Sequence, residues 1–129
     1  MQELLINIFD KPLGIIIYQL VSATRFTIYL SLIAFIGGGF IALLITFLRI
    51  YPSKILNFLS FLYVWLFQSL PLLMLLFLIG LGIPRFVGQD FDPWYAASIS
   101  LIVFTSAYLA EVWRGAILAI PKGQWEGAA

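Results

Sequence analysis

The sequence contains no cysteine and no histidine, and only 10% of its 129 residues are charged. The absence of cysteine excludes disulfide frameworks and thiolate zinc sites, and the absence of both residues excludes cysteine or histidine nucleophile–base chemistry. A metal site would have to depend on six scattered carboxylates. The net charge of +1 gives no basic field suited to nucleic acid. We therefore do not expect an enzyme active site in this chain alone.

Hydrophobic residues, in contrast, make up 63% of the chain. A soluble domain is about half apolar and about a quarter charged. A small domain buries only part of its surface, so a soluble core cannot hide this much apolar surface. Lipid is the solvent that accepts the rest.

The spacing of the charges defines the expected spans. Charge-free runs of 23, 30 and 18 residues follow one another along the chain. A helix needs about 20 apolar residues to cross a hydrocarbon core of about 30 Å. We predict an all-α integral membrane protein with three transmembrane helices, at about residues 26–48, 58–83 and 93–113.

Lysine and arginine predict the orientation of these spans. The loop at residues 49–54 holds two basic residues and no acid, whereas the loop at residues 84–92 holds one basic residue and two acids. Arg114 and Lys122 follow the third span. We expect the first loop and the C-terminus in the cytoplasm, and the N-terminus and the second loop outside.

The apolar stretch at residues 13–21 is too short to cross a bilayer. Pro12 can occupy the first turn of a helix, so one interpretation is a short helix on the outer membrane surface. The other interpretation is an irregular apolar leader into the first span.

Small residues recur at four-residue spacing in the first span, at Ala34, Gly38 and Ala42. Such a face lets another helix approach closely. We therefore expect this face to pack against a partner helix.

Polar residues and a proline interrupt the second span at Gln68, Ser69 and Pro71. Pro71 has no N–H to donate to the Phe67 carbonyl, and a polar amide in mid-span is costly unless it faces protein or water. One interpretation is a simple proline kink in which Gln68 bonds to a neighbouring helix. The other is a broken helix that binds a polar substrate near the membrane midplane.

The third span carries several hydroxyl residues, which can bond back to their own helix. Glu111 and Arg114 lie three residues apart and can pair at the cytoplasmic interface. The functional alternative places Glu111, and Tyr108 with it, on a polar translocation path.

Three ordered motifs then resemble one family. The second span reads YVWLFQSLPLL at residues 63–73, the third reads AYLAEVWRG at residues 107–115, and IPKGQWE follows at residues 120–126. In this order and at this spacing they closely resemble permease subunits of polar amino-acid ABC importers. The resemblance covers residues 24–129, and three ordered motifs are far more specific than one short pattern.

The resemblance implies a membrane permease subunit of an ATP-driven amino-acid importer with a type I fold of five spans. Residues 1–129 would be the N-terminal part of its transmembrane domain in a bacterial inner membrane. The implied partners are an ATP-binding subunit, a second permease that is the same or homologous, and an extracytoplasmic substrate-binding protein. No cofactor is expected in this chain, and ATP and Mg are expected on the ATPase partner.

The resemblance also implies a coupling helix, the EAA loop, that docks on the ATP-binding subunit, and the chain would stop inside this loop. For the substrate path we predict Gln68, Ser69, Tyr108 and Glu111. For coupling to the ATPase we predict Gly123, Gln124, Trp125, Glu126, Gly127 and Ala128.

The sequence departs from the family pattern at residues 68–71, where Gln-Ser-Leu-Pro replaces the usual Arg-Gly-Thr-Pro. The missing arginine removes a charge near the pathway, so the sequence does not name the amino acid carried. The alternative function is a small three-span membrane protein with a regulatory or pore-forming role. The sequence does not decide whether the permeases form a homodimer or a heterodimer, or whether this chain is a fragment.

Overall fold

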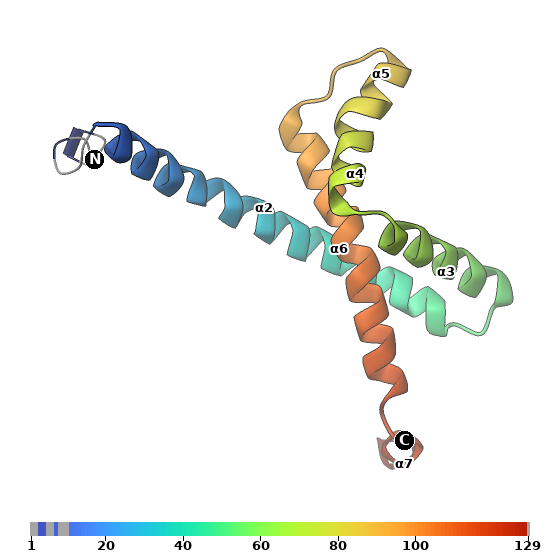
Figure 1. The fold of residues 1–129 in the computed structure, drawn as a ribbon. Coiled ribbons are helices and arrows are strands. Elements are labelled where there is room, and N and C mark those ends of the chain that lie inside the picture. The colour runs from blue at the N-terminus through green and yellow to red at the C-terminus, as the bar shows by residue number, and fades with distance from the viewer. Residues whose placement is uncertain (1–2, 5–6, 8–10, 129) are drawn as a thin grey trace. The chain divides into compact units, whose positions relative to one another are not determined.

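The structure, a computed structural model, describes residues 3–4, 7 and 11–128 of the chain (Figure 1). The all-α class predicted from the sequence is confirmed across these residues. The elements from residue 11 onward are α2 (Lys11–Ile50), α3 (Lys54–Ser69), α4 (Leu72–Phe77), the π-helical turn η1 (Leu78–Gly82), α5 (Ile83–Val87), α6 (Pro93–Leu118) and α7 (Lys122–Ala128).

The chain divides into two compact units, residues 1–32 and 33–129. In the first unit, residues 11–32 belong to α2, and Leu20 and Val21 are exposed. The hydroxyl of Thr24 donates to the Leu20 carbonyl at 3.0 Å, a bond within the helix. Because α2 is one helix from Lys11 to Ile50, the expectations of a separate short helix and of an irregular leader before the first span are both wrong. The physical reason is that Pro12 lies in the first turn of α2, where a proline is tolerated.

Side chains and special backbone positions set the helix ends of the second unit. Ser53 caps α3 by accepting from the Leu56 N–H, and Asp92 caps α6 by accepting from the Trp94 N–H at 2.8 Å. Pro93 occupies the first turn of α6, which needs no N–H donor there. At the end of α5, Gly88 adopts φ 81°, a left-handed conformation that favours glycine.

The expected second span, residues 58–83, is not one straight helix. α3 ends at Ser69, α4 begins at Leu72, and the helices on the two sides of this break are bent by 101°. Leu70 and Pro71 between them are both extended. A proline disfavours the helical conformation in the residue before it and removes an intrahelical hydrogen bond, so the break falls where the sequence places Pro71.

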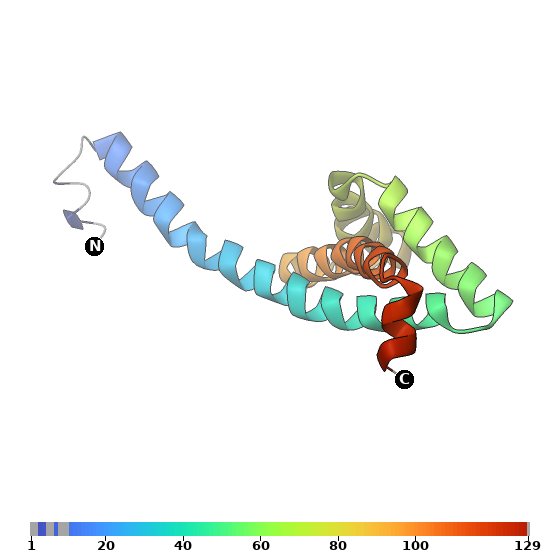
Figure 2. The same ribbon diagram turned by 90° about the horizontal axis from the view of Figure 1, so that it is seen from below.

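α6 is the helix on which the second unit is built (Figures 1 and 2). α3, α4 and η1 all contact it. One apolar cluster joins α2, α3 and α6 and contains Ala42, Ile45, Val64 and Ala110. A second cluster joins α4, η1 and α6 and contains Leu75, Ile79 and Ala96.

The small-residue face of α2 has its partner in the same chain. Ala34 and Ala42 are buried, and a Cβ added to Gly38 would lie 2.8 Å from the Cβ of Thr105 and 3.2 Å from the Ile102 carbonyl. The backbones of α2 and α6 therefore approach closely because residue 38 has no side chain. The expectation that this face packs against a helix is confirmed, and α6 is that helix.

Two helices are long and apolar enough to cross a membrane, at Pro12–Ile50 and Pro93–Leu118. The bent pair from Lys54 to Val87 meets the same test as a third span if it is taken together. Large apolar side chains are exposed on every one of these elements. Such apolar surface suits a multi-pass membrane protein, because lipid accepts it.

Candidate functional site

Polar side chains between the helices of the second unit are hydrogen-bonded. The Tyr63 hydroxyl and the Ser106 hydroxyl lie 2.8 Å apart and join α3 to α6. The Thr46 hydroxyl donates to the Ala110 carbonyl at 3.3 Å and joins α2 to α6. The buried Ser100 hydroxyl donates within α6 to the Ala96 carbonyl at 2.6 Å. These groups serve helix packing, because hydrogen bonding removes most of the cost of their burial.

The helix break presents a different environment. Gln68 is half-buried and makes no side-chain hydrogen bond within residues 11–128. The Ser69 hydroxyl is exposed and donates to the Trp65 carbonyl at 2.6 Å. The interpretation in which Gln68 bonds to a neighbouring helix therefore finds no such bond in the described part of this chain. Its amide keeps two donors and an acceptor for another group.

Near the other end of α6, Glu111 and Arg114 form the ion pair that their three-residue spacing predicts. The Arg114 Nη2 and the Glu111 Oε1 lie 2.5 Å apart, and Arg114 Nε donates to the same carboxylate at 3.2 Å. Tyr108, one turn before Glu111, is 42% exposed and its ring stacks on Phe104 with 4.7 Å between centroids. Among the described residues, no hydrogen bond or ion pair joins Gln68 or Ser69 to either of these side chains.

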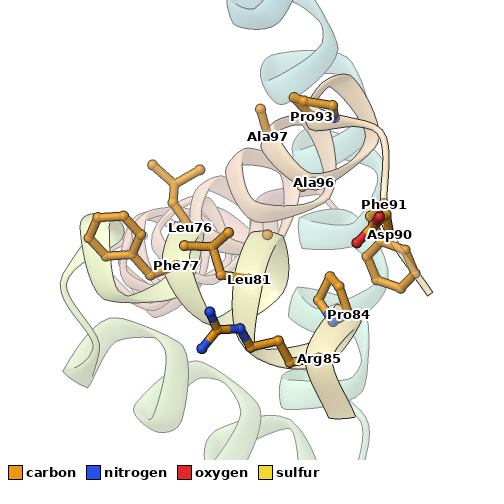
Figure 3. Close-up of a pocket in the computed structure, with 11 residues that line it drawn as sticks. Leu76, Phe77, Leu81, Pro84, Arg85, Asp90, Phe91, Pro93, Ala96 and Ala97 are labelled. Carbon is orange, nitrogen blue, oxygen red and sulfur yellow. The ribbon is translucent and has the colours of Figure 1, made fainter. Parts of the chain in front are cut away.

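A pocket of about 550 Å³ lies between η1, α5 and the first turns of α6 (Figure 3). Apolar side chains cover most of its wall, with Ala96 and Ala97 on the α6 side. Figure 3 shows Arg85 on one side of the pocket and Asp90, beside Phe91, on the other. An apolar hollow with one cation and one anion at its edges is complementary to a zwitterion. In the sequence, the charges of Arg85 and Asp90 indicated only the orientation of the second loop, and no motif indicated that these residues line one pocket.

The predicted coupling residues lie on α7, a helix that begins at Lys122 after Pro121. All six of them, from Gly123 to Ala128, are exposed, and Trp125 has 52% of its surface accessible. An exposed tryptophan on a short helix without a core contact is unusual, because tryptophan normally buries most of its surface.

Comparison with known proteins finds amino-acid permeases similar to this chain. No family model matches the sequence. The chain is 31% identical over 122 residues to the probable amino-acid ABC transporter permease protein YckA of Bacillus subtilis, covering 94% of this chain and 54% of that protein. It is 34% identical over 126 residues to the arginine ABC transporter permease protein ArtM of Haemophilus influenzae, covering 92% of this chain and 54% of that protein. Over most of its length the chain is similar to amino-acid ABC transporter permeases.

A solved structure of an amino acid ABC transporter has a similar fold. A crystal structure of an amino acid ABC transporter with histidines superposes with a TM-score of 0.81 at 29% identity. The match covers 90% of this chain and 55% of that chain. The chain spans about half the length of the curated relatives that it matches. The resemblance noted in the sequence is thereby confirmed.

The similar permeases are named after different transported compounds. One is a nopaline permease of Agrobacterium fabrum, 31% identical, and another is an L-cystine permease of Bacillus subtilis, 36% identical. Because the identities are similar for such different compounds, similarity to these permeases does not by itself indicate one substrate.

Proposed function

We propose that this chain is the N-terminal part of the transmembrane domain of an ATP-driven amino-acid importer. The observation that carries the proposal is the similarity to amino-acid permeases over more than nine-tenths of the chain. In this proposal residues 26–48 and 93–113 are complete spans, residues 58–83 form a broken span, and residues 121–129 begin the coupling loop. The permease crosses a bacterial inner membrane with its N-terminus outside, an orientation supported by the basic loop at residues 49–54.

The substrate path passes the helix break in this proposal. A break frees backbone groups and exposes polar side chains at a depth where an intact helix offers none. Gln68 is the strongest candidate, because its amide is half-buried and lacks an intramolecular partner among the described residues. Ser69 offers its hydroxyl next to it. Tyr108 and Glu111 continue the path on α6, where Glu111 is already neutralised by Arg114.

α7 is the contact to the ATP-binding subunit in this proposal. Its exposed residues Gly123, Gln124, Trp125, Glu126, Gly127 and Ala128 would enter a groove on that subunit, with Trp125 as the apolar anchor. ATP and Mg bind the partner and not this chain. A second permease copy or homologue completes the path, and an extracytoplasmic binding protein delivers a polar amino acid. Closure of two ATPase subunits then moves α7 and, through it, the spans.

The first test is to sequence the coding DNA beyond codon 129. We expect the remainder of a coupling loop and two further apolar spans, in this frame or a shifted one. A stop codon with no such segments downstream would make the three-span chain the natural product and would support the small membrane protein instead.

The second test measures coupling in proteoliposomes that contain the natural permease, its ATPase and its binding protein. Trp125→Ala should abolish the stimulation of ATP hydrolysis by loaded binding protein, because it removes the anchor of α7. Trp65→Ala is the matched control, since Trp65 is similarly exposed at 56% but lies on α3, away from α7 in the sequence. Equal stimulation in the wild type and the Trp125→Ala variant would reject α7 as the coupling element.

A further inference from the structure

A second pocket, of about 590 Å³, lies where the end of α2, the beginning of α3 and the last turns of α6 meet. Its polar lining consists of Arg49, Asn57 and Arg114, and its apolar lining includes Phe58 and Phe61. The guanidinium of Arg49 lies over the Phe61 ring, 5.2 Å from its centroid. The aromatic ring thus holds the cation in a fixed position at the pocket wall.

Two buried polar atoms of this pocket have no hydrogen-bond partner in the described chain. They are the Nη1 of Arg49, a donor, and the Oδ1 of Asn57, an acceptor. A buried polar atom without a partner is rare in a native protein and requires an explanation. One donor and one acceptor in the same pocket point to a ligand that offers both an acceptor and a donor.

The charge of the pocket selects the sign of that ligand. Arg114 is paired with Glu111, and Glu111 also attracts Arg49 electrostatically, so that two guanidinium groups share one carboxylate. The pocket therefore keeps one uncompensated positive charge. Arginine is the side chain best suited to phosphate, since its planar fork matches phosphate oxygens.

We propose that this pocket binds the headgroup of an anionic phospholipid, with the phosphodiester on the Arg49 guanidinium and a headgroup hydroxyl at the side-chain amide of Asn57. The position supports a lipid, because Arg49 is the penultimate residue of a helix long enough to span the membrane, and headgroups lie at such ends. Exposed Phe58 and Ile50 at the pocket give the acyl chains an apolar surface. Both faces of a bilayer carry phosphodiesters, so the proposal does not depend on the orientation of the chain.

The test is native mass spectrometry of the purified natural permease after titration with phosphatidylglycerol, which has a phosphodiester and hydroxyl donors. Arg49→Gln should weaken retention of this lipid roughly tenfold, because the variant removes the charge that binds the phosphate. Lys54→Gln is the matched control, because Lys54 begins α3 shortly after Arg49 in the sequence but does not line the pocket. This variant also removes one positive charge, and it should retain phosphatidylglycerol as well as the wild type does. Equal retention in the Arg49→Gln and Lys54→Gln variants overturns the proposal.

A second variant keeps the test decisive if Arg49→Gln does not fold. Asn57→Asp preserves the shape of the side chain and places a carboxylate in the pocket, so retention of phosphatidylglycerol should fall as well. Unchanged retention in this variant overturns the proposal.

Two further arms separate the sources of the anion. Inorganic phosphate at millimolar concentration should not displace the lipid, because it has no acyl chains. If inorganic phosphate does displace the lipid, the ligand of the pocket is a free phosphate, and the proposal is overturned. If Arg49→Gln instead retains the lipid and loses the ATP-binding subunit in a pull-down, the pocket is a docking point for a protein carboxylate, which also overturns it.

Discussion

α6 and the α3–α5 segment are both apolar and long enough to cross a bilayer, yet α6 is one helix of 26 residues and α3–α5 is bent by 101°. Polar residues do not account for this difference. In α6, Ser100 and Ser106 bond back to carbonyls of their own helix, and in α3 Ser60 and Ser69 do the same. Serine in a membrane helix is thus compatible with a straight course.

Proline position separates the two segments. Pro93 lies in the first turn of α6, where its missing N–H leaves no carbonyl without a donor. Pro71 lies in the interior of a long apolar run and coincides with the break. One proline in mid-run thus changes a candidate span into two helices, and the half-buried Gln68 lies next to the break.

The largest expected effect comes from Pro71→Ala, which would make α3–α5 resemble α6. An interior proline costs a helix about 3 kcal/mol, so its removal favours a continuous helix by a similar amount. Because this chain has no cysteine, the substitutions Leu59→Cys and Leu81→Cys provide two unique sites for spin labels. The distance between the two labels, measured by electron paramagnetic resonance, reports the bend. With the 101° bend, the helix axes at these positions are roughly 20 Å apart, and a straight helix would separate them by about 33 Å.

Pro84→Ala is the control for this measurement. Pro84 lies in the first turn of α5, where proline is compatible with the helix, and its replacement should leave the distance unchanged. A distance that stays near the shorter value in Pro71→Ala would show that packing on α6, and not the proline, holds the bend.

An intermediate effect is expected at the contact of α2 with α6. Gly38→Ala should lower the free energy of unfolding by about 1–3 kcal/mol, because the new Cβ would lie 2.8 Å from the Cβ of Thr105. Gly39→Ala is matched to it, since its Cβ would meet only the end of the Trp113 ring at 3.8 Å. The control should be neutral or stabilising by up to about 1 kcal/mol. Unfolding in detergent by SDS titration, followed by circular dichroism, measures both, and equal stabilities would contradict the close approach.

The smallest effect concerns the hydrogen bond that ties the bent segment to α6. Tyr63→Phe should cost about 0.6 kcal/mol, the average for such bonds between membrane helices, because it removes the bond to Ser106. Tyr95→Phe is the control, as Tyr95 is 70% exposed. A double-mutant cycle with Ser106→Ala isolates the pair, and a coupling energy of zero would remove this bond as a link between the two segments.

The all-α membrane class followed from composition and charge spacing, because hydrocarbon excludes charges and requires helices to satisfy the backbone. The position of the break followed from Pro71, since the restriction that a proline imposes is local. The ion pair of Glu111 with Arg114 followed from their spacing on one helix. The resemblance to amino-acid permeases followed from three ordered motifs.

Other features depend on residues far apart in the chain, which no local pattern relates. The continuous course of α2, the choice of α6 as partner for Gly38, and the bond of Tyr63 with Ser106 belong to this group. The same holds for the two pockets, one lined by Arg85 and Asp90 and the other by Arg49 and Asn57. The sequence by itself determined what each helix is made of and where it breaks, because those properties are local. Only the tertiary structure decided which polar groups share a pocket, because that depends on how the helices pack.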